Sequence, residues 1–206
     1  MNIVTPSRVS SGIVLYHDDY LEHYKMESAL MKINNRPNGK RLIDKITQLS
    51  TEDKKVKINV DYYAPTMSFG DLTQSQRDKL NFSCDTPFID TVIAAETLSH
   101  KKGFLRKGEG VGSQIRWNPT TSPFSRNGKE MIDELETSNF ISLAHELVHS
   151  MRLLNGTSKA NDFKRFPARD GHNEELRAIG LGRYTFKRMS ENAIRAEHGI
   201  ERRNEI

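Results

Sequence analysis

Two histidines and a glutamate in the sequence HELVH, which runs from His145 to His149, are the residues best suited to chemistry. Side chains four positions apart share one face of a helix, about 5 to 6 Å apart, so both imidazoles can bind one tetrahedral zinc ion. Glu146 is rotated by about 100° from His145 around such a helix, which leaves its carboxylate beside the metal as a base for water. The spacing therefore predicts a zinc centre that activates water. The alternative is a core helix in which the histidines are incidental.

A helix must position these side chains, and the flanking sequence has the features of one. Thr137, Ser138 and Asn139 are candidate N-terminal caps, and Gly156 follows the last apolar residue. Between them, apolar residues recur at the spacing of a buried helix. These are Phe140, Ile141, Leu143, Ala144, Leu147, Val148, Met151 and Leu154.

Zinc at such a site requires a third protein ligand, and the sequence GHNEELRAIGLGRY downstream of His149 contains the candidates. Glu174 and Glu175 are both possible ligands on a predicted helix. His172 is a weaker candidate, because it precedes that helix in a Gly171-His172 loop, where an imidazole is usually a surface group.

The rest of the chain predicts a fold that mixes helices and strands. Helical spacing covers residues 18–33 and 42–49, whereas Lys55 to Tyr63 alternates as a half-buried strand. Residues 64–86 are polar and irregular, and the apolar stretch 88–95 fits either a strand or a short helix. We expect a plain loop over residues 103–110. Val111 to Trp117 predicts a second strand, which is either the edge strand over an active-site cleft or an interior strand with Trp117 buried.

Length and composition limit the alternatives. The 206 residues predict a flexible lead-in over residues 1–15 and one domain over 16–206. Cys84 is the single cysteine, which excludes an intramolecular disulfide and a cysteine-based zinc site. Neither a signal peptide nor a membrane-spanning run is predicted. The net charge is only +4, and the lysines and arginines are interspersed with acidic residues. This distribution argues against nucleic acid as the main partner. A non-catalytic basic interaction module, with HELVH serving structure, is the competing hypothesis.

Longer stretches of the sequence resemble two related families. HELVH followed by EELRAIGLG is similar to the light chains of clostridial neurotoxins. The stretches VGSQIRWNP and SENAIRAEHGI extend the similarity to NleD-type zinc metallopeptidases, effectors that bacteria inject through type III secretion. The resemblance covers about residues 110–203. It implies an α+β, zincin-like metallopeptidase domain with a small mixed sheet and an active-site helix.

The resemblance also implies roles for individual residues. His145, His149 and Glu175 match the zinc ligands and Glu146 the catalytic base. Glu174 is the rival third ligand, because Asn followed by Glu also matches the pattern of thermolysin-like enzymes.

Three further residues match groups around the metal in those families. Glu191 would hold a zinc-binding histidine. Arg195 and Tyr184 would stabilise the oxyanion. The alternative for Glu191 and Arg195 is a surface ion pair one helical turn apart.

The resemblance finally implies a biological setting. The expected activity is hydrolysis of a peptide bond in a host protein, with stress-activated MAP kinases favoured as substrates. The expected partners are that substrate and the type III secretion machinery, and the expected location is the host cell cytoplasm, without membrane binding.

Overall fold

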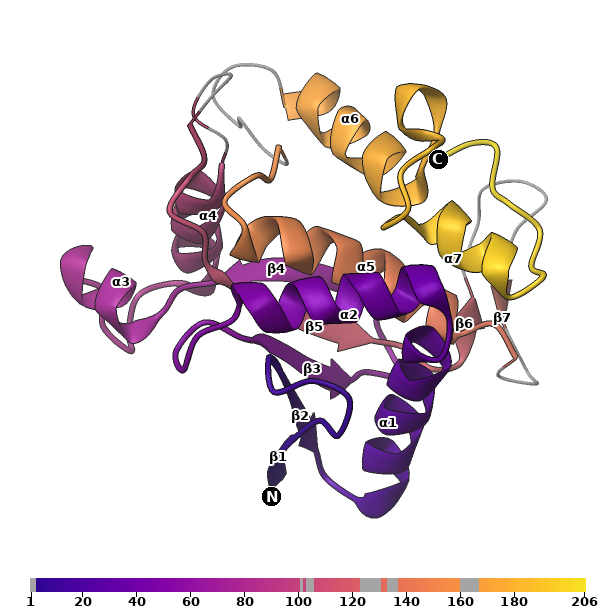
Figure 1. Cartoon of the computed structure of the whole chain (residues 1–206). Coiled ribbons are helices and arrows are strands. Elements are labelled where there is room, and N and C mark those ends of the chain that lie inside the picture. Colours follow the sequence, from indigo (N-terminus) through magenta and orange to yellow (C-terminus); the bar gives the residue numbers. More distant parts are fainter. Residues whose placement is uncertain (1–2, 101, 103–105, 123–130, 133–136, 160–166) are drawn as a thin grey trace.

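A five-stranded mixed sheet with helices packed against it organises the molecule (Figure 1). The structure is a computed structural model that describes residues 3–100, 102, 106–122, 131–132, 137–159 and 167–206. The strands are β1 (Ile3–Pro6), β2 (Ile13–His17), β3 (Val56–Val60), β4 (Met67–Asp71), β5 (Gly112–Trp117), β6 (Thr121–Ser122) and β7 (Met131–Ile132). The helices are α1 (Tyr20–Asn34), α2 (Pro37–Leu49), α3 (Gln74–Lys79), α4 (Phe88–Ser99), α5 (Phe140–Leu154), α6 (Pro167–Ile179), α7 (Glu191–Glu197) and the 3₁₀ turn η1 (Gly182–Tyr184).

The large sheet has the order β1-β2-β3-β5-β4, and β6 pairs with β7 separately. Its three central strands run parallel, whereas β1 and β4 are antiparallel to their neighbours. The chain crosses from β2 to β3 through α1 and α2, because parallel neighbours cannot be joined by a tight hairpin. The predicted α+β class with a small mixed sheet is thus confirmed.

The strand predicted at Val111 to Trp117 is β5, and it lies inside the sheet between β3 and β4. Trp117 is buried, and its indole Nε1 donates to Ser142 Oγ at 3.2 Å. The edge strand is instead β4, within the stretch 64–86 that we expected to be irregular. It was missed because it has only five residues, and Gly70 and Asp71 are both disfavoured in strands.

The first residues of the chain also differ from expectation. Residues 1–15 were predicted as a flexible lead-in, yet the structure places Ile3–Pro6 in β1 and begins β2 at Ile13. Ile13 and Leu15 are fully buried in the core. The Ser, Thr and Pro content of this segment concealed the short apolar run IVLY.

The helical predictions before the motif are confirmed by α1 and α2. Helix α2 begins at Pro37, earlier than the predicted residue 42, because proline is tolerated in the first turn of a helix. The undecided stretch 88–95 is helical, within α4. No helix in the described ranges combines the length and the apolar character needed to cross a bilayer.

The main hydrophobic core lies between the sheet and the helices α1, α2 and α5. Ile58, Ile115 and Leu147 are among its fully buried members. Each such side chain contributes about 1.5–3 kcal/mol through burial. Figure 1 shows α2 beside α5 over the sheet and α6 and α7 farther from it, so α5 is the element around which the helices are arranged.

Candidate metal centre

Helix α5 carries HELVH and is almost entirely buried, as the sequence predicts. It begins after Asn139, whose side-chain amide donates to the carbonyl of Pro119 at 2.7 Å. It ends before Gly156, which has φ of +63° and approaches Gly108 too closely for a side chain. These contacts at its two ends fix the position of α5 along its axis, and therefore the position of both histidines, relative to the sheet.

His145, His149 and Glu175 converge on one point, and their possible ligand atoms lie within 4.8 Å of one another. The two Nε2 atoms are 3.0 Å apart. Glu175, from α6, lies 3.2 Å from His145 Nε2 through Oε2 and 3.3 Å from His149 Nε2 through Oε1. Ligand atoms of a tetrahedral zinc site with bonds of about 2.0–2.1 Å are about 3.3 Å apart. The donor atoms present therefore fit zinc in both type and spacing.

The electrostatics of the three side chains favour positive charge at this point. Burial opposes the charged imidazole, but hydrogen bonds to Glu175 and Glu191 outweigh it and raise the pKa of His145 well above its usual value. The pKa of His149 is raised in the same way, chiefly through Glu175. Burial likewise opposes the charged carboxylate of Glu175, but its hydrogen bonds to both histidines lower its pKa far below the usual value. The carboxylates of Glu175 and Glu191 thus place negative charge beside the imidazoles, which favours a bound proton or a metal cation there.

The carboxylate of Glu174 does not join the cluster, although Glu174 is adjacent to Glu175 in sequence. It is buried and forms a two-pronged ion pair with Arg152, whose Nε and Nη2 donate to its two carboxylate oxygens. The backbone N–H of Lys159 also donates to Glu174, at 3.1 Å. Its carboxylate is therefore committed to Arg152, and geometry favours Glu175 as third ligand. His172 is exposed on α6 and does not belong to the cluster.

Glu146 lies beside the cluster and is not part of it. Its Oε2 accepts a hydrogen bond of 2.6 Å from Ser68 Oγ on β4. Both residues line a cleft of about 360 Å³ that also contains His145, His149 and Glu175. Sequence reasoning missed Ser68, because the only local signal was the short pattern Met67-Ser68-Phe69 within a stretch that lacks longer alternation.

Glu191 contacts His145 on the side of the ring away from the cluster, as the resemblance implies. Its Oε2 lies 2.8 Å from His145 Nδ1. Its Oε1 accepts from Arg195 Nε at 2.6 Å, and Arg203 Nη1 donates to Oε2 at 3.3 Å. Burial disfavours the carboxylate, but His145 and the two arginines outweigh this effect and lower the pKa of Glu191. A charged partner on Nδ1 leaves Nε2 of His145 as the ligand atom.

Arg195 and Tyr184, predicted to stabilise an oxyanion, are not among the residues that line this cleft. Arg195 is fully buried and also donates to the carbonyl of Glu201, so it positions His145 through Glu191. Tyr184 is buried in η1 beneath the guanidinium groups of Arg177 and Arg183. Their role at an oxyanion stays a prediction.

A mixed sheet, a buried helix with HExxH and a glutamate from the next helix are the features expected of an HExxH metallopeptidase. The chain belongs to the Peptidase_M91 family, which is described as "Effector protein" and whose pattern matches residues 15–205. Membership of a peptidase family confirms the predicted class of protein. The comparison with the curated proteins found no match.

Solved structures similar to this chain include the light chain of Clostridium botulinum neurotoxin serotype F, at 15% identity and TM-score 0.41 over 68% of this chain and 37% of that one. The botulinum neurotoxin type G light chain has 14% identity and TM-score 0.38 over 72% and 45%. The catalytic domain of C. botulinum neurotoxin serotype F has 15% identity and TM-score 0.41 over 78% and 41%. The chain thus spans less than half the length of the structures that it matches.

Proposed function

We propose that this protein is a zinc-dependent endopeptidase that a bacterium injects through type III secretion to cut a host signalling protein. The observation that carries the proposal is the convergence of His145, His149 and Glu175 within 4.8 Å, with Glu146 beside them in the same cleft. The family description "Effector protein" supports the setting in a host.

His145, His149 and Glu175 would hold the zinc ion. When bound, zinc supplies Lewis-acid chemistry, which polarises a carbonyl and makes water more acidic. Glu146 accepts the proton of the attacking water and then donates it to the leaving amine. Ser68 holds the carboxylate of Glu146 in place through one oxygen and leaves the other oxygen for that proton.

The edge strand β4 supports the cleavage of a peptide. Its residues Met67 to Gly70 line the cleft, and among the described strands only β5 pairs with β4, on one side. An extended substrate can pair with such an edge through its own backbone. The preferred substrates, stress-activated MAP kinases, rest on the resemblance of residues 110–203 to NleD-type enzymes.

The test incubates the purified chain with candidate MAP kinases and with a generic unfolded protein, beside a chelator-treated sample and Glu146→Ala. We expect about one zinc per chain, a kinase fragment with the wild type, and no fragment from the two controls. Intact kinases alongside a cleaved generic substrate would contradict the kinase assignment. Absence of both metal and cleavage would favour the non-catalytic interaction module instead.

A further inference from the structure

A second cavity lies along a different face of α5 from the histidines. Val148, Met151 and Arg152 line it, whereas His145, Glu146 and His149 line the cleft. The cavity has a volume of about 700 Å³, within the usual range of small-molecule sites. Its remaining lining residues come from α2, α6 and the segment before α7, and are Arg41, Asp44, Lys45, Gln48, Arg177, Lys187, Arg188 and Met189.

Six of the eleven lining residues are cationic and one is acidic. The acid, Asp44, pairs with Lys40 outside the cavity at 3.0 Å. Among the cations, Arg152 is neutralised by Glu174. No ion pair within the described ranges involves any of the other five, which are Arg41, Lys45, Arg177, Lys187 and Arg188. The cavity therefore has an uncompensated positive charge.

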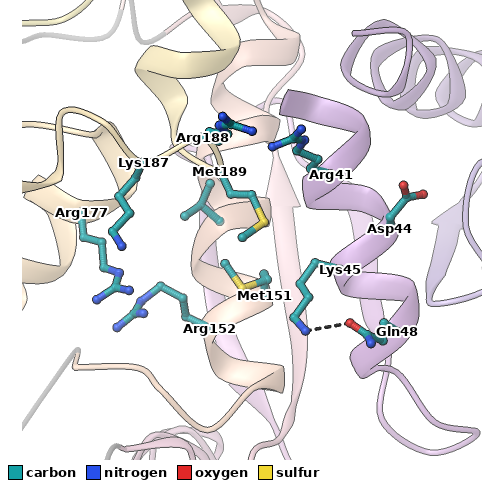
Figure 2. A pocket seen from close by; sticks show the side chains of 11 residues that line it. Arg41, Asp44, Lys45, Gln48, Met151, Arg152, Arg177, Lys187, Arg188 and Met189 are labelled. Carbon is teal, nitrogen blue, oxygen red and sulfur yellow. Dashed lines mark hydrogen bonds between the residues drawn. The ribbon is translucent and has the colours of Figure 1, made fainter. Parts of the chain in front are cut away.

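The cations converge from both sides onto an apolar base. Figure 2 shows Arg177 and Arg152 directed toward one another on one side, Lys45 on the other, and the Met151 and Met189 side chains between them. Burial, and next the neighbouring charge of Arg152, lower the pKa of Arg177, although Glu174 and Tyr184 oppose this effect. Cations held this close repel one another, and an anion between them would remove the repulsion.

We infer that this cavity binds a compact polyanion, several phosphates carried on a small carbon ring, of the inositol polyphosphate class. The guanidinium and ammonium groups come from different elements around the cavity, which suits phosphates that point in several directions. The apolar base formed by Val148, Met151 and Met189 matches the carbon ring. An extended acidic peptide fits less well, because the cavity is lined mainly by helical side chains and not by a strand edge.

The test measures binding of inositol hexakisphosphate by calorimetry, with inorganic phosphate as the monovalent comparison. Arg41→Gln/Lys45→Gln removes two lining cations, and Lys32→Gln/Lys102→Gln removes two exposed cations outside the cavity, with the same change in net charge. We expect the first pair to weaken binding by at least about tenfold, the second to have little effect, and salt to weaken binding throughout. Metal content after each titration separates binding from removal of zinc.

A stability measurement distinguishes a binding role from a structural one. Without ligand, Arg41→Gln/Lys45→Gln should melt at the same or a higher temperature than the wild type, because like-charge repulsion is relieved. The wild type should gain more stability from inositol hexakisphosphate than this variant does. A lower melting temperature together with unchanged binding would overturn the inference.

Vesicles of phosphatidylcholine with phosphatidylinositol bisphosphate identify the source of the ligand. Capture by these vesicles, competed by the soluble compound and lost in Arg41→Gln/Lys45→Gln, assigns the site to a lipid headgroup; binding of the soluble compound alone assigns it to a free polyphosphate. Binding to neither, equal loss in both variants, or binding only to an acidic peptide would refute the inference. Because none of these readouts is peptidase activity, failure of the proposed peptidase function would not affect this outcome.

Discussion

The Glu191 carboxylate lies directly behind His145, with Oε2 2.8 Å from Nδ1. Arg195 and Arg203 keep that carboxylate charged from the other side. This contact fixes the tautomer and the ring orientation of His145 before any metal arrives. Ser190 caps α7 by accepting from the N–H of Ala193, so the first turn of a short helix sets the position of the metal centre.

Replacement of this carboxylate should loosen the metal site. Glu191→Gln keeps the size of the side chain but removes its charge, and we expect zinc affinity to fall by about 10–100-fold. Competition with a chelator of known affinity measures the loss. The control is Glu201→Gln, an exposed carboxylate close to α7 in sequence. Equal zinc affinity in Glu191→Gln and the control would contradict the positioning role.

The adjacent glutamates Glu174 and Glu175 should fail in different ways. Glu175→Gln should lose zinc, because the partners of Glu175 are the two histidines that would share the ion. Glu174→Gln should keep the zinc ligands but leave Arg152 buried without a charged partner, at a cost of about 3–5 kcal/mol in the free energy of unfolding.

Metal analysis and urea unfolding of both variants give the comparison. Loss of zinc from Glu174→Gln in a folded protein would transfer the ligand role to Glu174. Unchanged unfolding of that variant would refute the structural role of its pair with Arg152.

Ser68 should affect turnover more than binding. Ser68→Ala removes the hydrogen bond that orients Glu146, and we expect kcat to fall by about 10–100-fold with little change in KM or in zinc content. Ser68→Thr retains a hydroxyl at the same position and should recover part of the rate. A kcat equal to the wild type in Ser68→Ala would show that Glu146 needs no such support.

His198 should make stability depend on pH. Burial lowers its pKa, and although Glu197 opposes this, Arg36 and Lys32 reinforce it. Its ring packs on Phe140 with centroids 4.8 Å apart. Below the unfolded pKa of about 6.5 the unfolded chain takes up a proton that the folded chain does not, so this contribution to stability is present above that pH and lost as the pH falls.

Urea unfolding of the wild type and His198→Asn between about pH 8 and pH 5 measures this contribution. The difference in unfolding free energy between the two proteins should shrink as the pH falls. A difference that stays constant with pH would contradict the prediction.

Much of the centre follows from local sequence. The spacing within HELVH is enough to place two imidazoles on one helical face, because helix geometry is local. The alternation in Val56–Val60 and Gly112–Trp117 predicted two central strands for the same reason. Residues 64–86 were not resolved into β4 and α3, because five residues with Gly70 and Asp71 do not alternate clearly.

Local sequence was enough to predict the pair of histidines, the candidate base Glu146 and the helix that carries them, because all depend on contacts within about one turn. The tertiary structure was needed to distinguish Glu175 from Glu174 as the candidate third ligand. Both lie on α6, and they differ because Arg152 forms an ion pair with Glu174. The tertiary structure also decided that β4, through Ser68, holds Glu146. These contacts join residues 22 and 78 positions apart, and local spacing carries no information about such distances.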